Sequence, residues 1–331
     1  MKKILFYLKK IKQKLQLLRN YLYDYSRMTA CSSAVHWGDN REKLRSLIII
    51  RYHGIEKGLS LESPREGFGV NRVHNLLGLL KDYVRLYGFD YTCASAAESL
   101  LAYRQFNSKS GSFAPALESQ IADLENRLAE YRKSNGDECQ KGGLLTLTRL
   151  ELEKAASLDF ESFCRSRYSV RQFSDKPADL EIVKDAIRIA QKTPSVCNRQ
   201  PGRVWVVQEE EKVKTILRIG GGAIGFEDQI KMLLVVTSDL SCFQAAGERY
   251  QCWIDGGMFL MSLMYALHSK GLVSCCMNWS KEHEDDKRLR DYMELPLSES
   301  VIALLGVGCP RDEFAVACSS RKPLDEVIRY Y

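Results

Sequence analysis

Apolar residues recur at helical spacing through most of the first half of the chain. The pattern predicts helices over Met1 to Arg27, Arg41 to His53, Val73 to Tyr87, Ala94 to Phe106 and Ala114 to Ser134. Two glycine-containing stretches, His53 to Ser60 and Ser63 to Gly69, predict shaped loops between the second and third helices. We interpret Ser134 to Gly143 as a further loop, followed by one helix that ends at Ala156. The first half is therefore predicted to be all helical.

The pattern changes after Ala156, where short runs rich in β-branched residues alternate with helices. Strands are predicted at Val204 to Val207, Met232 to Thr237 and Val301 to Val307, and helices at Leu180 to Gln191, Gly256 to Lys270 and Lys287 to Met293. This alternation indicates an α+β or α/β domain. We divide the chain into a basic amphipathic helix at 1–27, a helical extension at 28–156 and a second domain at 157–331.

The first predicted helix carries most of the net charge. The 30 residues from Met1 to Ala30 hold eight Lys or Arg and one acid, Asp24, which gives +7 there and leaves −1 for the rest of a chain whose net charge is +6. Such a helix can lie on an anionic membrane, or it can dock its apolar stripe on its own protein or a partner. The sequence leaves both alternatives open.

Charge and composition exclude several classes of function. The nearly neutral body argues against nucleic-acid binding, which needs clustered Lys and Arg on the folded domain. The eleven cysteines form no C-x-x-C pair and the five histidines no metal-spaced pair, so we expect free thiols and no metal site. No apolar run approaches the ~20 residues of a membrane span. We expect a cytoplasmic protein, with peripheral attachment at the inner face of the membrane as the alternative.

Two short motifs carry candidate chemistry. The first is Arg167-Tyr168-Ser169-Val170-Arg171, in which two arginines four residues apart flank a hydroxyl. An arginine fork matches the oxygens of a phosphate, so this spacing is typical of a phosphate contact. By itself the motif also fits a solvated charged turn.

The second motif follows a predicted helix of the same domain. Pro194-Ser195-Val196-Cys197-Asn198-Arg199-Gln200-Pro201 precedes a predicted strand. The amides of Asn198 and Gln200 can each donate and accept hydrogen bonds, which suits the ribityl hydroxyls and the polar edge of an isoalloxazine ring.

In this order and spacing, the two motifs resemble the opening of the nitroreductase family. The resemblance continues through Gly225 to Gln229, Asp255 to Met258, Gly271 to Cys276, Gly306 to Pro310 and Arg321 to Val327, and covers about 175 of the 331 residues. It implies an α+β fold with a nitroreductase-like mixed sheet flanked by helices, here preceded by an all-helical N-terminal domain. The chain departs from the family at Thr193, where alanine is usual, and at Gly202, where tryptophan is common.

The resemblance also implies a cofactor and a subunit arrangement. FMN would be bound at the interface of a homodimer, and the segment at 194–200 would reach the flavin of the partner. The helix from Gly256 to Lys270 would lie in that interface. The residues carried over as flavin contacts are Arg167, Tyr168, Ser169, Arg171, Pro194, Ser195, Asn198, Gln200, Cys275, Cys276, Gly308, Arg321 and Lys322.

The reaction implied by the resemblance needs no catalytic side chain, because the flavin carries the chemistry. NAD(P)H would pass hydride to N5, and the reduced flavin would reduce an electron-poor small molecule in a ping-pong cycle. His53 and Gly202 are candidates for a lid or a substrate contact. The alternative function is an interaction module, with or without flavin, that acts through its helical extension.

One further motif is set aside. Gly220 to Gly225 matches the G-x-G-x-x-G fingerprint literally, but it follows a predicted helix from Glu211 to Ile219 and not a strand. We predict a helix end and loop there, and no dinucleotide site.

Overall fold

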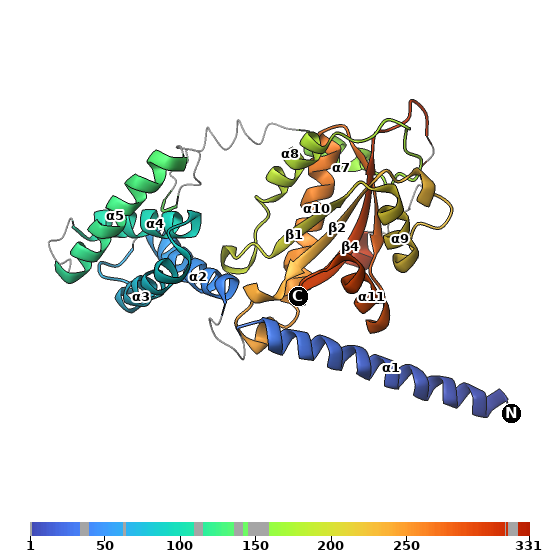
Figure 1. The fold of residues 1–331 in the computed structure, drawn as a ribbon, viewed down its shortest axis with the longest axis horizontal. Helices are drawn as coiled ribbons and strands as arrows, with labels where there is room; N and C mark the ends of the chain where they lie inside the picture. Colours follow the sequence, from blue (N-terminus) through green and yellow to red (C-terminus); the bar gives the residue numbers. More distant parts are fainter. Residues whose placement is uncertain are drawn as a thin grey trace.

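The computed structural model describes residues 2–33, 40–61, 64–108, 115–135, 142–144, 159–314, 316 and 324–331. It shows three parts: a long N-terminal helix, a group of helices and a helix-flanked sheet (Figure 1). The helix that was expected to end at Ala156 and the expected domain boundary lie outside the described residues.

The N-terminal helix α1 runs from Lys2 to Cys31. Its last turns lie against the sheet domain, and its first turns extend away from the rest of the molecule (Figure 1). The predicted helix at 1–27 is confirmed and is one turn longer than the sequence indicated.

Four helices form the extension: α2 (Arg41–Leu59), α3 (Val70–Tyr87), α4 (Tyr91–Asn107) and α5 (Pro115–Asn135). Their apolar faces meet in a hydrophobic core of their own, whose members all come from residues 44–128. Asp90 caps the start of α4 and pairs with Arg45 of α2 at 2.7 Å, while its carboxylate also accepts from the Tyr83 hydroxyl. The predicted helical extension is therefore confirmed over the described residues.

The expected loop at His53 to Ser60 is wrong, because α2 continues through it to Leu59. The glycines serve packing here. A Cβ on Gly54 would lie 1.8 Å from the Arg72 side chain, and one on Gly58 would lie 2.1 Å from the Phe68 ring. Gly54 and Gly58, four residues apart, thus share the face of α2 on which the start of α3 rests. The second glycine stretch is a turn as predicted, with positive φ at Gly67 and Gly69.

The second domain is built on a four-stranded sheet of β1 (Gly202–Val207), β2 (Met232–Asp239), β3 (Val273–Asn278) and β4 (Glu299–Gly308), in the order β1-β2-β4-β3. All three strand pairs are antiparallel, and a parallel bridge joins Ser169 to Ser274. The α+β class is confirmed; the four described strands form an antiparallel sheet, to which the bridge adds one parallel contact. Three strands fall at predicted sites, whereas β3 was not expected.

Helices cover both faces of the sheet. Alternate residues of β2 point to opposite faces: Leu233 and Val235 pack with α9 (Glu210–Gly220) and α11 (His283–Met293), while Leu234 and Val236 pack with α8 (Leu180–Ala190) and α10 (Gln251–Ser269). Because helices cover both sides, every residue of β2 is buried. Gly221 ends α9 in the left-handed conformation, so the helix-end interpretation of the glycine run is confirmed.

Short elements complete the domain. They are α7 (Phe160–Ser166), α12 (Leu324–Val327) and the 3-10 turns η2 (Val196–Asn198), η3 (Glu227–Gln229), η4 (Leu240–Cys242) and η5 (Ala246–Glu248). The extension meets this domain where α2 packs on η2 and η4; there the Ser46 hydroxyl donates to the Cys242 carbonyl at 2.9 Å.

Candidate functional site

The two predicted motifs lie at opposite ends of the sheet. Ser169 bridges Ser274, which the register places level with Val307 and Met232, whereas Gly202 lies level with Ser238. Met232 and Ser238 are six residues apart on β2, which corresponds to about 20 Å along a strand. One chain therefore does not bring the two motifs together.

The arginine motif is an extended segment beside β3. The Val170 amide donates to the Ser274 carbonyl at 3.0 Å, and the Val170 side chain is buried. Arg167 is half-buried beside β3, whereas Arg171 is exposed and its guanidinium lies 6.0 Å from the centre of the Phe226 ring. Within the described ranges, neither arginine forms an ion pair with a carboxylate. This is the charge arrangement expected of a phosphate site.

Three other predicted residues gather around this segment. Cys275 and Cys276 lie on β3 close enough for the charges of Arg171 and Arg167 to act on them. Burial raises the pKa of both thiols, and the two arginines oppose that rise, so the thiols stay protonated at neutral pH. Gly308 lies at the end of β4, where a Cβ would be 2.7 Å from the Phe173 ring. Its role here is to let Phe173 pack.

A third arginine in this region was missed by sequence reasoning. Arg311 donates to the Phe173 carbonyl at 2.8 Å and to Gln229 at 3.1 Å. It follows directly after the Gly308-Cys309-Pro310 end of the strand, and this position in the sequence could have identified it as a candidate. Arg167 and Tyr168 also line a small cavity of about 90 Å³ with His268 and Phe314. The predicted contacts Arg321 and Lys322 lie outside the described residues.

The amide motif is a strained loop. Cys197, Asn198 and Gln200 all have positive φ, at 48°, 54° and 52°. Non-glycine residues seldom adopt this conformation, which costs on the order of 1–3 kcal/mol each and persists where the surroundings impose it. Such strain is found disproportionately at functional sites. The loop is therefore held in shape by its neighbours.

Three charged residues impose that shape. The buried Arg199 guanidinium donates to the Val196 carbonyl at 3.0 Å and to the Cys242 carbonyl at 2.6 Å, and it pairs with Glu248. Arg203 donates to the Gln200 carbonyl at 2.8 Å and pairs with Asp239 at 3.3 Å.

The third, Asp255, is buried at the start of α10 and accepts from the Val196 amide at 3.1 Å. From the sequence, Arg199 was part of the second motif and Asp255 began a segment of the resemblance, but no role was predicted for them or for Arg203. The acidic partners of the two arginines, Glu248 and Asp239, are distant in sequence, so neither ion pair could be predicted from the motif.

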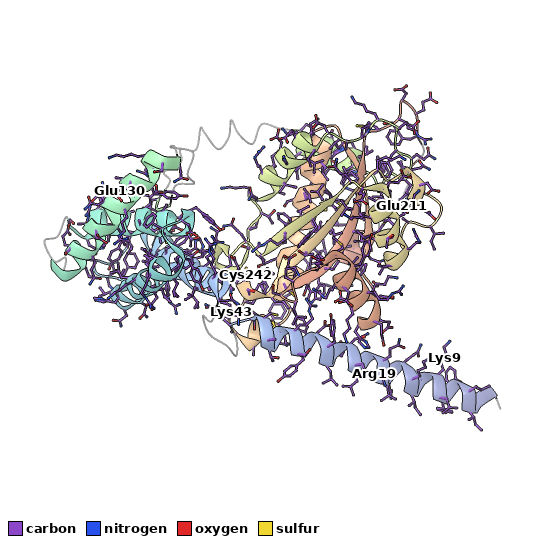
Figure 2. All side chains as sticks on the ribbon, viewed as in Figure 1. Lys9, Arg19, Lys43, Glu130, Glu211 and Cys242 are labelled. Atoms are coloured by element: carbon purple, nitrogen blue, oxygen red, sulfur yellow. The ribbon has the colours of Figure 1, made fainter. Side chains whose placement is uncertain are left out.

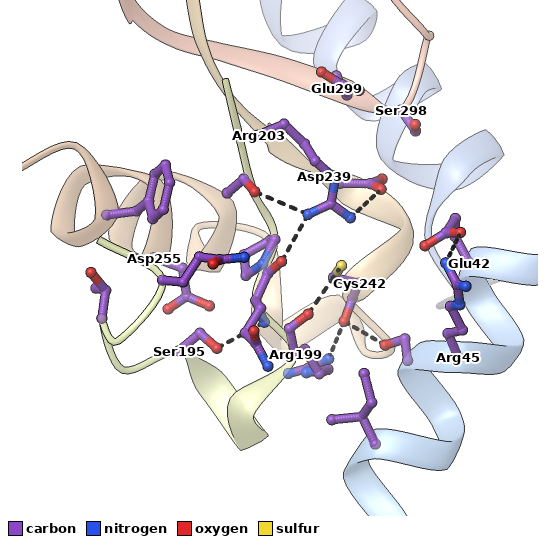
Figure 3. Close-up of a pocket in the computed structure, with 18 of the residues that line it drawn as sticks. Glu42, Arg45, Ser195, Arg199, Arg203, Asp239, Cys242, Asp255, Ser298 and Glu299 are labelled. Atoms are coloured by element: carbon purple, nitrogen blue, oxygen red, sulfur yellow. Dashed lines mark hydrogen bonds and ion pairs between the residues drawn. The ribbon is translucent and has the colours of Figure 1, made fainter. Parts of the chain in front are cut away.

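The Ser195 hydroxyl closes the loop by accepting from the Gln200 amide at 2.9 Å (Figure 3). Pro194, Ser195, Gln200 and Gly202 then line a cavity of about 590 Å³, a size typical of small-molecule sites. Its far wall comes from the extension, through Arg45 and Tyr52 of α2 and Tyr91 and Ser95 of α4. The cavity thus lies between the two domains.

The cavity lining combines charged side chains with apolar ones such as Ile49 and Phe259. Its ionic side chains are Glu42, Arg45, Arg199, Arg203, Asp239, Asp255 and Glu299, several of which Figure 3 shows paired with one another. Gly202 leaves room for Phe259 on this lining, since a Cβ there would be 2.7 Å from the ring. A tryptophan at position 202 would displace Phe259.

His53 does not line this cavity. Its ring contacts Glu56 at 3.1 Å on the same helix, and Glu56 also accepts from Ser99 and the Gly143 amide. The structure places His53 in a network internal to the extension.

The described residues lack two features of other functional classes. None of the helices in the described ranges combines the length and apolar character needed to cross a membrane. The same ranges contain no group of three or more His, Cys, Asp or Glu side chains placed to hold a metal ion.

Comparison with known proteins finds a family similarity in part of this domain. Residues 164–251 match the model described as Nitroreductase family. Among curated relatives, human iodotyrosine deiodinase 1 is 26% identical over 200 residues, which are 52% of this chain and 68% of the relative. NADH dehydrogenase of Thermus thermophilus is 24% identical over 202 residues, 52% of this chain and 95% of the relative. Chloronitrobenzene nitroreductase of Comamonas testosteroni is 25% identical over 220 residues, 51% and 96% of the two chains.

A solved nitroreductase-like protein from Streptococcus mutans is 21% identical and covers 52% of this chain and 98% of its own, with a TM-score of 0.45. The match to the family model at residues 164–251 confirms the resemblance drawn from the two motifs. The family match and these relatives support an oxidoreductase of that family.

Proposed function

We propose that this chain is an FMN-dependent oxidoreductase that transfers electrons from NAD(P)H to an electron-poor small molecule. The carrying observation is the Arg167-x-Ser169-x-Arg171 segment, whose two arginines form no ion pair with a carboxylate in the described ranges. Bound FMN would supply the redox chemistry, accepting hydride at N5 and returning electrons to the acceptor.

In this proposal the arginine segment binds the phosphate. Its donors are the forks of Arg167 and Arg171 and the Ser169 hydroxyl, supported by Ser274, whose carbonyl fixes the Val170 amide. Cys275, Cys276 and Gly308 give the segment its packing, and Arg321 and Lys322 remain proposed contacts from the sequence resemblance. The local charge favours a phosphate dianion.

The strained loop would orient the flavin ring, with the Asn198 and Gln200 amides as donors and acceptors. Because this loop lies about 20 Å from the arginine segment of its own chain, we assign it to the flavin of a second copy. The exposed apolar side chains Trp253, Ile254 and Met258 on α10 support a dimer. They lie next to Asp255, which holds the loop, so the same helix would join the interface and the site.

The interdomain cavity is the proposed acceptor site. Its floor is the strained loop and its cover is α2 and α4, so the extension would exclude water and select the acceptor. The paired arginines and carboxylates around it favour a polar or zwitterionic acceptor over a purely apolar one. His53 itself does not line the cavity. A lid role for it would have to act through Tyr52, the preceding residue, which lines the cavity wall.

Steady NAD(P)H oxidation tests the enzyme. Purified protein with FMN, NADH or NADPH, and a quinone or nitroaromatic acceptor is expected to turn over in proportion to acceptor concentration. A protein that binds FMN yet oxidises neither nicotinamide with any acceptor would favour the alternative, an interaction module that acts through its extension. The exposed apolar face of α1, the helix that precedes this extension, is the observation that favours an interaction role.

A further inference from the structure

The helix α1 docks on the protein through its polar side. The Asn20 amide donates to Glu282 at 2.7 Å, and the Tyr23 hydroxyl donates to Asp286 at 2.9 Å. Arg27 is buried and donates to the carbonyls of Leu297 and Glu299 at 3.0 and 2.8 Å. The residues at 20, 23 and 27 share one face of a helix.

The apolar stripe lies on roughly the opposite side. Its six members recur at alternating spacings of four and three, and each is between 53% and 64% exposed: Ile4, Leu8, Ile11, Leu15, Leu18 and Leu22. The sequence left open whether this stripe docks on its own chain. In the described residues it does not, because the docking face is the polar one.

The charge beside the stripe is of one sign. From Met1 to Tyr23 the chain holds seven Lys or Arg and no Asp or Glu. Lys12, Lys14 and Arg19 flank the stripe, and aromatic residues at Tyr7, Tyr21 and Tyr25 are exposed near it. An apolar face bordered by cations and aromatics is the pattern of a helix that lies in a membrane interface.

A second copy of the helix is a poorer occupant. The four-three spacing would also suit a coiled-coil seam, but the flanking positions would then set Lys14 of one copy against Arg19 of the other. Like charges at those positions oppose pairing. An anionic lipid surface complements both the stripe and its borders.

We propose that α1 attaches the protein to anionic membrane surfaces, with the leucine stripe in the interface. The first turns of α1 extend beyond the body of the molecule (Figure 1), and Lys9 lies along that part in Figure 2, whereas Arg19 lies where the helix meets the body. The body can therefore stay in water while the stripe enters the headgroup layer. The buried Arg27 connects α1 to the first residue of β4 by donating to the Glu299 carbonyl.

Sedimentation with vesicles tests the attachment on the full chain. The protein is expected to bind vesicles of equal parts phosphatidylcholine and phosphatidylglycerol at least about tenfold more tightly than phosphatidylcholine alone, and to be released by salt. Leu15→Glu is expected to lower the binding constant at least about tenfold. Gln13→Glu is the matched control, since it adds the same charge to the exposed opposite side and is expected to lower it only a few-fold.

Three results would overturn the proposal. One is an absence of binding to the anionic vesicles while far-ultraviolet circular dichroism shows a folded protein. Another is an equal loss of vesicle binding in the two variants, which would mean that charge alone determines binding and that the stripe does not enter the interface. The third is a lipid-free self-association that Leu15→Glu abolishes and Gln13→Glu leaves intact, which would make a second copy the occupant.

Discussion

Arg199 donates to both carboxylate oxygens of Glu248, a residue 49 positions further along the chain, and the Nη1 to Oε2 distance is 3.1 Å. The Arg199 side chain is 1% exposed and that of Glu248 is 23% exposed. The same guanidinium also donates to the Val196 carbonyl of the strained loop and to the Cys242 carbonyl of η4. The loop geometry therefore depends on a contact that connects η2 with η5.

Removing the guanidinium should unfold the loop and weaken the domain. Arg199→Ala leaves a partly buried carboxylate without its partner, for which about 3 kcal/mol of unfolding free energy is expected to be lost. Urea denaturation measures the loss. Arg188→Ala, on the exposed face of α8, is the control and is expected to change stability by less than about 0.5 kcal/mol. Equal effects in the two variants would contradict the assigned role.

Acid should weaken the same contact. Burial alone would raise the pKa of Glu248, but the Arg199 guanidinium and the amides of Gln244 and Ala245 hold it below its usual value. A carboxyl with a depressed folded-state pKa stabilises the protein above its unfolded pKa, and that stabilisation is lost as pH falls through the folded value. Glu248→Gln is therefore expected to reduce the fall in stability below about pH 4. An unaltered pH profile, with the exposed Glu211→Gln as reference, would argue against it.

Two helix glycines should respond oppositely to alanine. Gly58→Ala places a methyl group 2.1 Å from the Phe68 ring and is expected to cost about 1–3 kcal/mol. Gly78 lies on an exposed face of α3 with nothing near its Cβ position, so Gly78→Ala is expected to stabilise by about 0.5–1 kcal/mol. Thermal or urea unfolding of both variants measures the two changes in stability, which are expected to have opposite signs. A stabilised Gly58→Ala would mean that α2 and α3 do not pack as described.

The phosphate assignment predicts a loss of flavin without a loss of fold. Arg167→Ala or Arg171→Ala removes a charge-assisted contact worth roughly 1.5–3 kcal/mol. The FMN dissociation constant is therefore expected to rise by about 10- to 100-fold. Arg165→Ala, whose side chain is exposed and paired with Glu161, is the control and should bind FMN normally. FMN titration followed by fluorescence measures all three. Unchanged affinity in both motif variants would refute the site.

The dimer assignment concerns the exposed side of α10. Trp253→Ser together with Ile254→Ser is expected to give a monomer that loses flavin, because the strained loop would no longer reach a partner. Light scattering with the absorption spectrum measures both properties. A monomeric wild-type protein that holds FMN at micromolar concentration would contradict the assignment.

Much of the fold followed from the sequence because periodicity reports which faces are buried. The helices of the extension and three of the four strands fall where apolar spacing placed them. β3 was missed because Ser274, Cys275 and Cys276 lack the β-branched character of a typical strand. The loop predicted at Gly54 and Gly58 was wrong for another reason, because glycine is typical of loops. Only the nearby side chains of Phe68 and Arg72 show that these glycines permit close helix packing.

The candidate site was likewise predictable only in part. The two motifs were recognisable because their residue types and spacing are local, whereas Arg199, Arg203 and Asp255 act through partners far along the chain. The interdomain cavity was beyond sequence reasoning altogether, since it forms only when α2 and α4 meet the strained loop. His53 drew attention through its glycine neighbours, but its contacts are with Glu56 inside the extension.

The most direct test of the central claim is the visible absorption spectrum of the purified protein, with mass identification of any cofactor released on denaturation. The account predicts flavin bands and the release of FMN. A colourless protein that also fails to take up added FMN would contradict the claim that this nitroreductase-family domain works as a flavoenzyme.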